Sequence, residues 1–135
     1  MQVAICLDDR QGMLFHQRRL SQDRVMRADL LNALQGRKLW LNDYSARQFS
    51  AEDREKLCIT EDFLDKTPDD AYCFVENQAL KPYAERIEKL IVYRWNRVYP
   101  SDMRLDLDLS TWNLVYQEDF PGYSHEKITK EIYTR

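Results

Sequence analysis

Two short apolar runs in the middle of the chain predict two strands of one sheet. Tyr72–Val75 and Leu90–Tyr93 are continuous, and they are rich in β-branched and aromatic residues. Runs of this kind are typical of strands that are covered on both faces, as in the middle of a parallel sheet. Pro82, in the connection between them, favours the start of a helix. The stretch therefore predicts a strand–helix–strand crossover, a connection that is almost always right-handed.

The segments before this crossover alternate between strand and helix patterns. Val3–Leu7 predicts a first strand that is apolar on both faces, and Lys38–Leu41 and Lys56–Thr60 predict two further short strands. A short helix is expected through Ser45–Phe49, and residues 9–21 are expected to form a loop that turns at Gly12. This alternation is the signature of an α/β sheet.

The first long helix is predicted from an apolar stripe. Met26, Leu30 and Leu34 recur at a spacing of four residues, which places them on one face of a helix. Ser21 is the expected N-cap of this helix, because its hydroxyl can accept a backbone N–H in the first turn. Gly36 is expected to close the helix at its C-terminal end.

The pattern changes after residue 100. Arg104–Leu109 alternates strictly between charged and apolar residues, and Trp112–Tyr116 alternates again. Lys127–Tyr133 predicts a last strand, and such one-sided strands are typical of antiparallel pairing towards the edge of a sheet. We therefore predict a single α/β domain over residues 1–135. It has a mixed, mostly parallel central sheet, helices on both faces and antiparallel C-terminal strands.

Composition and charge narrow the functional classes. With 44% apolar and 32% charged residues, the chain has enough apolar side chains for a packed core and is not expected to be disordered. The net charge of −3 argues against direct nucleic-acid binding, which depends on clustered Lys and Arg. The first residues lack the basic start of a signal peptide, and no apolar run has the roughly 18 residues that a membrane span needs. We expect a cytoplasmic protein that binds no membrane.

Motifs of known catalytic centres are absent from the sequence. The two histidines, His16 and His125, are far apart, and neither belongs to a metal-binding motif such as H-E-x-x-H. No G-x-S-x-G elbow marks a nucleophilic serine, so a catalytic triad is not predicted. Cys6, Cys58 and Cys73 lie in apolar, strand-like runs without C-x-x-C spacing, which predicts neither a disulfide framework nor a zinc site.

The order of elements and several short motifs resemble dihydrofolate reductase along nearly the whole chain. Leu20-Ser21-Gln22-Asp23, at the start of the first helix, resembles the Leu-Pro-x-Asp of the family. The closing segment, from Trp112 to a terminal Tyr-x-Arg, resembles the C-terminal hairpin of the family. The resemblance implies a dihydrofolate reductase-like fold. Because the carboxylate of that motif serves the pterin in the family, the resemblance also implies a proton-handling role for Asp23.

The sequence departs from the family where the cofactor phosphates bind. The family has Gly-Arg-x-Thr after its second strand, where this chain reads NDYS at 42–45. It has Gly-Gly after the strand that matches Tyr72–Val75, where this chain reads EN at 76–77. Backbone N–H groups can cradle phosphate when a ligand approaches them closely, and the side chain of Glu76 blocks that approach. Because G-x-G-x-x-G and P-loop motifs are also absent, we predict no cofactor.

Acidic residues follow the predicted parallel strands in place of these glycines. Ligands of open α/β sheets bind outside the carboxyl ends of the strands. Two carboxylates about 6 Å apart repel by about 3 kcal/mol at an effective dielectric near 20, so an acidic rim favours a cation, a metal or a basic protein surface. Acidic residues also collect at helix N-termini, and this explanation stays open for each of them. The predicted partner-binding residues are Asp8, Asp9, Asp43, Glu61, Asp62 and Glu76.

The hypothesis that fits these observations best is a non-catalytic binding protein. A small, acidic domain without catalytic motifs resembles the immunity proteins of contact-dependent growth inhibition systems, which bind and neutralise a cognate toxin. Because many such toxins are nucleases with basic active sites, the expected partner is a toxin domain with a basic surface. Two alternatives stay open. One is a divergent reductase-like enzyme with Asp23 as its proton-handling carboxylate, and the other is a small domain that contacts RNA.

Overall fold

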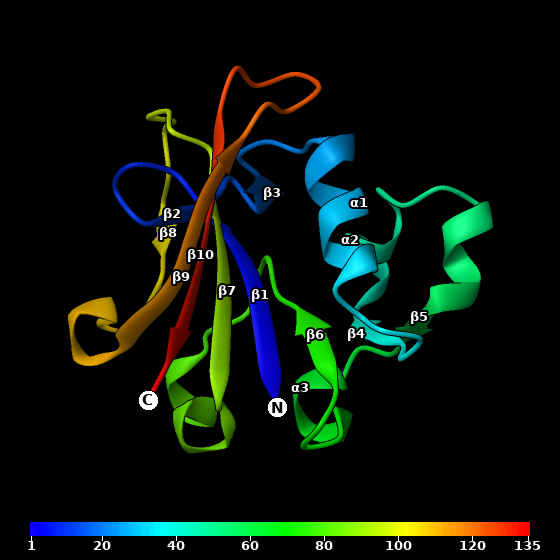
Figure 1. Cartoon of the computed structure of the whole chain (residues 1–135). Helices are drawn as coiled ribbons and strands as arrows, with labels where there is room; N and C mark the ends of the chain where they lie inside the picture. Colours follow the sequence, from blue (N-terminus) through cyan, green and yellow to red (C-terminus); the bar gives the residue numbers. More distant parts are fainter.

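Seven strands form the main sheet of the protein (Figure 1), and the computed structural model describes residues 1–135. The strand order is β5-β4-β6-β1-β7-β10-β9, in which the first five strands run parallel to one another and β10 runs antiparallel to both of its neighbours. The predicted mixed, mostly parallel α/β sheet is therefore confirmed. Its strands are β1 (Gln2–Leu7), β4 (Leu39–Leu41), β5 (Leu57–Ile59), β6 (Tyr72–Phe74), β7 (Lys89–Arg94), β9 (Asn113–Phe120) and β10 (Ile128–Thr134).

The middle strands of the sheet are buried on both faces, as their apolar runs predict. In β1, Val3 and Ile5 face one core, whereas Ala4 faces the other. In β7, Leu90 joins the first of these cores and Ile91 joins the second. Continuous apolar runs thus fold as strands here because successive side chains point to opposite faces of the sheet, and each face packs against a hydrophobic core.

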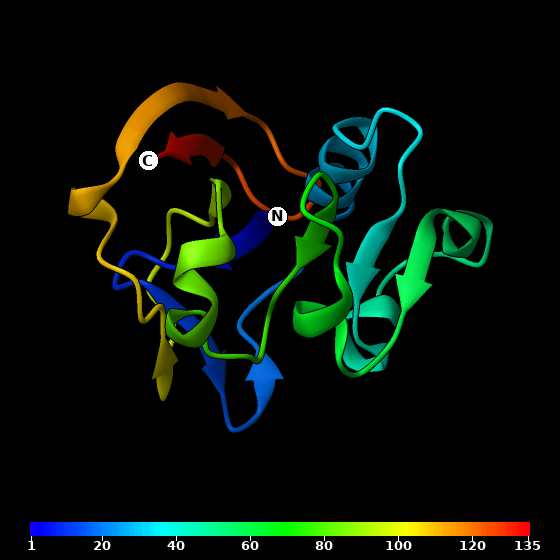
Figure 2. The same ribbon diagram turned by 90° about the horizontal axis from the view of Figure 1, so that it is seen from below.

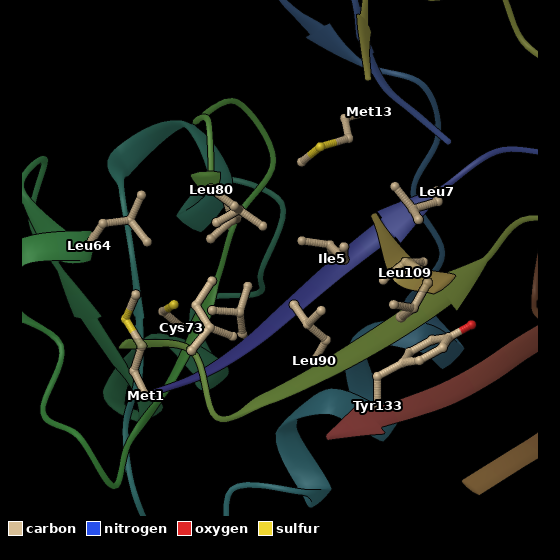
Figure 3. Close-up of a cluster of buried hydrophobic side chains, with 14 of the residues drawn as sticks. Met1, Ile5, Leu7, Met13, Leu64, Cys73, Leu80, Leu90, Leu109 and Tyr133 are labelled. Atoms are coloured by element: carbon tan, nitrogen blue, oxygen red, sulfur yellow. The ribbon is translucent and has the colours of Figure 1, made fainter. Parts of the chain in front are cut away.

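Helical segments cover both faces of the sheet (Figure 2). The core that contains Ala4 and Ile91 lies on the α1 side of the sheet, and we call it the α1-side core. Met26 and Leu30 of α1 (Arg24–Asn32) pack in it. The α3-side core, whose side chains are drawn in Figure 3, receives the first two residues of α3 (Phe63–Lys66). No helix in the structure combines the length and the apolar character that crossing a bilayer requires. The remaining helical segments are α2 (Asp43–Ala46), η1 (Glu52–Lys56), η2 (Lys81–Arg86) and η3 (Leu109–Thr111).

Two helix starts differ from their predicted positions. The N-cap of α1 is Asp23, whose carboxylate accepts the N–H of Val25 at 2.9 Å, so the prediction of Ser21 as the cap is wrong. The hydroxyl of Ser21 instead forms a hydrogen bond with a distant histidine, and the helix starts beyond it. Similarly, α2 starts directly after β4, because the side chain of Asn42 accepts the N–H of Ser45 at 3.0 Å and caps it.

The segment expected to be a loop forms most of a second, three-stranded sheet. Its strands are β3 (Arg18–Arg19), β2 (Gly12–Phe15) and β8 (Met103–Arg104), in the order β3-β2-β8. The turn between β2 and β3 is made by His16 and Gln17, which both have positive φ. The loop prediction was wrong because this hairpin turn lacks the Gly that usually marks one.

The C-terminal strands are antiparallel, and β9 forms the edge of the main sheet. Nearly all of β9 is exposed, whereas Ile128 of β10 is fully buried in the α1-side core. The strand predicted over Arg104–Leu109 is wrong beyond its first residue. Asp106 accepts the N–H groups of Leu80 and Lys81 at 3.0 and 2.9 Å. The alternating residues therefore form an irregular loop that covers the α3-side core.

Candidate functional site

The carboxyl ends of the parallel strands meet at one edge of the main sheet. Because β5, β4, β6 and β1 are neighbours and all run in the same direction, the polar residues after them are brought close together. The side chains of Asn42 and Asn77 share a hydrogen bond of 2.9 Å between the ends of β4 and β6. The backbone N–H of Asp43 donates to Glu61 at 2.9 Å between the ends of β4 and β5.

Asp8, which follows β1, is fully buried and holds the chain around it. Its carboxylate accepts the N–H groups of Gly12 at 2.7 Å, Arg10 at 2.9 Å and Tyr99 at 3.0 Å. Burial by itself raises the pKa of Asp8, but these hydrogen bonds outweigh it and lower the pKa. A Cβ at position 12 would lie 2.8 Å from Oδ1 of Asp8, so the contact requires glycine. Asp8 is therefore a structural carboxylate that a partner cannot reach.

Glu76, which follows β6, is buried in an ion pair with Arg19. Nε of Arg19 donates to Glu76 at 2.9 Å, and Gln48 donates to the same carboxylate at 3.0 Å. The guanidinium also stacks 4.3 Å from the ring centroid of Tyr44 and donates to its carbonyl at 3.0 Å. The side chain of Arg19 thus lies across the ends of β4 and β6. It neutralises the carboxylate that the sequence suggests is free.

The outer carboxylates, Asp43, Glu61 and Asp62, remain accessible. Asp43 forms an exposed pair with Arg47 at 2.6 Å, and Glu61 is exposed. The hydroxyl of Thr60 donates to Asp62 at 2.6 Å and lowers the pKa of this carboxyl, which stays ionised at neutral pH. Asp9, after β1, is also exposed. Partner binding by these four residues stays a prediction, whereas Asp8 and Glu76 are not available for it.

A hollow of about 330 Å³ lies beside two of the outer carboxylates, Glu61 and Asp62. Glu61, Asp62 and Asp65 line it together with Gln78 and Tyr83. Burial, followed by the negative charge of Asp65, raises the pKa of the Tyr83 phenol, so the phenol keeps its proton and can donate. The hollow therefore combines carboxylate acceptors with neutral polar groups.

A third buried carboxylate, Asp23, binds the loop between β9 and β10. In Figure 1 this loop lies beside the start of α1. Oδ1 of Asp23 accepts the N–H of Tyr123 at 3.0 Å, and Oδ2 accepts the N–H of Ser124 at 2.9 Å and lies 2.8 Å from Nδ1 of His125. Gly122 allows this approach, because a Cβ there would lie 2.6 Å from Oδ2.

The contacts of Asp23 argue against the acid role implied by the resemblance. Burial by itself raises its pKa, but hydrogen bonds from His125 and from the N–H groups of Tyr123, Ser124 and Val25 outweigh it and lower the pKa far below its usual range. A carboxyl that holds no proton at neutral pH and is only 2% exposed cannot donate one to a ligand.

His125 connects Asp23 to a serine. Its Nε2 atom lies 2.8 Å from Oγ of Ser21 and 3.5 Å from the hydroxyl of Tyr99. Its ring is 4% exposed and stacks on Trp95 at a centroid distance of 4.5 Å. This cluster was not predicted from the sequence because His125 lies about a hundred positions from Ser21 and Asp23. Only the closing of the C-terminal hairpin over α1 brings them together.

The structure shows no metal-binding cluster, and two of the three thiols have a raised pKa. No group of three or more His, Cys, Asp or Glu side chains is placed to hold a metal ion. Burial raises the pKa of Cys73 to about 12 and also raises the pKa of Cys6, so both keep their protons.

Among solved structures, the chain is similar to dihydrofolate reductase from Enterococcus faecalis, which is described as complexed with NADP(H) and RAB-propyl. The TM-score is 0.66, and the match covers 100% of this chain and 96% of the other at 11% sequence identity. The chain has a dihydrofolate reductase-like fold. At this identity the likeness shows the fold alone. No protein-family model matches the chain, and no curated protein matches it.

Proposed function

We propose that this protein is an immunity protein without reductase activity, which binds the basic surface of a cognate bacterial toxin and neutralises it through the outer carboxylates. The observation that carries the proposal is the contrast along one sheet edge. The side chain of Arg19 fills the ends of β4 and β6, whereas Asp43, Glu61 and Asp62 are left accessible, the last two beside a hollow.

The hollow supports a basic partner because three of the seven residues that line it carry carboxylates. Glu61, Asp62 and Asp65 contribute carboxylates, and the hollow of about 330 Å³ is large enough to admit a lysine or arginine side chain. A cation that enters it meets several negative charges at short range, which favours binding over solvation. No compensating cation is among the residues that line the hollow.

The charge of this surface also favours a fast encounter with the partner. Exposed charges of one sign steer an oppositely charged protein, and the rate of association then falls as salt is added. A nuclease toxin presents a basic surface because it binds phosphate groups. The outer carboxylates would cover that surface and exclude the nucleic acid.

Co-expression with toxin domains encoded by neighbouring genes tests the proposal. The wild-type protein is expected to rescue growth and to bind the toxin in calorimetry. The double charge reversal Glu61→Lys with Asp62→Lys is expected to abolish rescue. Glu52→Lys with Glu88→Lys is the matched control, because these exposed residues carry the same charge but lie before β5 and β7, at the amino ends of the strands. Equal rescue by both double variants would contradict the proposed surface.

The alternative, a divergent reductase-like enzyme that uses Asp23, is supported only by the fold. Binding of folates or NADPH in calorimetry would favour it. Its carboxylate is engaged by His125 and by the start of α1, which leaves no free oxygen facing a ligand. The proposal of an immunity protein is therefore preferred.

A further inference from the structure

We infer that Ser21, His125 and Asp23 form a nucleophilic triad that cleaves small carboxylic esters. In this arrangement Ser21 is the nucleophile, His125 is the general base and Asp23 is a positioning residue. The hydroxyl, the imidazole and the carboxylate follow one another at 2.8 Å and 2.8 Å, which is the geometry that activates a serine.

The hydrogen bonds around His125 fix the tautomer that a base needs. Asp23 can only accept, so Nδ1 of His125 carries the proton that it shares with Oδ2. In the neutral imidazole Nε2 is then the nitrogen without a proton, and it can accept the proton of the Ser21 hydroxyl. Stacking on Trp95 at an interplanar angle of 20° holds the ring in this orientation.

The carboxylate is itself held rigidly, as a positioning residue must be. Asp23 accepts backbone N–H groups from Val25, Tyr123 and Ser124 at 2.9, 3.0 and 2.9 Å. A carboxylate that only capped α1 would need the contact with the N–H of Val25. It would not need a histidine that continues the hydrogen bonds to a serine hydroxyl. The complete chain from carboxylate to hydroxyl is therefore more than a helix cap.

A hollow next to the serine offers space for the substrate. Leu20 and Tyr99 belong to the wall of a cavity of about 490 Å³, and the hydroxyl of Tyr99 approaches the same Nε2 atom as Ser21 does. The wall also contains Phe15 and Arg18, which suit an apolar or aromatic group and a negative charge. Ser21 is half-buried and directly follows Leu20 of this wall.

The chemistry that this arrangement supports is acyl transfer to water. Oγ of Ser21 attacks the ester carbonyl while its proton passes to Nε2 of His125. The bond to the leaving oxygen then breaks, and His125 returns the proton to the leaving alcohol. Water attacks the acyl-serine in the same way, which releases the carboxylic acid and restores the hydroxyl. The backbone N–H groups of Ser21 and Gln22 donate to no protein acceptor.

Covalent labelling with a fluorophosphonate probe tests the nucleophile directly. Intact-mass analysis of the full chain is expected to show one adduct, and peptide mapping is expected to place it on Ser21. Ser21→Ala is expected to abolish the adduct, whereas Ser110→Ala, which removes an exposed hydroxyl on η3, is expected to leave it unchanged. Absence of an adduct on the wild-type chain, or an adduct that persists in Ser21→Ala, overturns the inference.

The kinetics of p-nitrophenyl acetate hydrolysis distinguish a positioning role of Asp23 from a role in folding alone. Ser21→Ala is expected to lower kcat at least about 100-fold. Asp23→Asn is expected to lower kcat with little change in KM, because the amide no longer fixes the imidazole but does not touch the ester. Wild-type hydrolysis no faster than that of Ser21→Ala overturns the inference.

This inference is independent of toxin neutralisation. Ser21 lies at the start of α1, whereas the proposed binding hollow follows β5. Ser21→Ala is expected to rescue growth as well as the wild type does, so the two proposals fail or succeed separately.

Discussion

The inner carboxylates, Asp8, Asp23 and Glu76, and the outer carboxylates, Asp43, Glu61 and Asp62, differ in what they contact. Each inner carboxylate is buried and receives several hydrogen bonds from backbone, imidazole, guanidinium or amide donors. The outer carboxylates face solvent, and each has one kind of partner. Asp43 pairs with an exposed arginine, Asp62 accepts from a hydroxyl, and Glu61 accepts from a single backbone N–H.

The difference teaches that burial and the number of surrounding donors decide what a carboxylate does. Inner carboxylates stabilise the fold, because donors that would otherwise be buried without partners depend on them. Outer carboxylates contribute little to stability and keep their charge available for another molecule. Substitutions at the two groups should therefore change different observables.

Asp23→Ala should cause the largest loss of stability. It removes the N-cap of α1 and leaves the imidazole of His125 and two loop N–H groups buried without an acceptor. Breaking such a buried cluster costs about 3–5 kcal/mol, measured as the free energy of unfolding in urea. A loss below about 1 kcal/mol would mean that the loop between β9 and β10 is held by other contacts.

Acid should remove part of the same stabilisation. Because hydrogen bonding lowers the folded-state pKa of Asp23 below its ordinary 3.8, its contribution is fully present above pH 3.8 and is lost as the pH falls below that value. The free energy of unfolding of the wild type should therefore fall more steeply below about pH 4 than that of Asp23→Asn, which does not titrate. Parallel pH curves for the two proteins would contradict this account.

Glu76→Ala should lower the free energy of unfolding by about 2–3 kcal/mol, which is less than the loss expected for Asp23→Ala. The loss is smaller because the side chain of Arg19 is partly exposed and can be hydrated when its partner is removed. A double-mutant cycle with Arg19→Ala isolates the pair, and a coupling of about 1 kcal/mol or more is expected. Additive losses in the two single variants would mean that the guanidinium does not depend on Glu76.

The double charge reversal of Glu61 and Asp62 should have the smallest effect on stability. Both side chains face solvent, so the free energy of unfolding is expected to change by no more than about 0.5 kcal/mol. Thermal unfolding by circular dichroism is the check. A loss as large as that of Glu76→Ala would assign these residues to the inner group.

The main sheet could be predicted because local pattern and final environment agree. Tyr72–Val75 and Leu90–Tyr93 are apolar at every position, and they fold as neighbours of β1 with a core on each side. The spacing of Met26 and Leu30 likewise matches one face of α1. Each of these features is encoded within a few residues.

The candidate sites could not be predicted in the same way, because they depend on long-range partners. Nothing near Glu76 indicates that Arg19 will neutralise it, since the two meet only through the β2–β3 hairpin. Ser21 and Asp23 read as helix-start residues, and their partner His125 arrives from the last hairpin. Residues 104–109 alternate like a strand, yet their acids bind loop N–H groups.

Titration of the wild-type protein with NADPH in a calorimeter tests the central claim most directly. The claim is that the paired side chains of Arg19 and Glu76 fill the ends of β4 and β6 and leave no room for a dinucleotide there. We expect no binding at concentrations up to about 1 mM. Binding with a Kd of about 1–10 μM that is abolished by Tyr44→Ala would show that the cleft is open, and it would contradict the account.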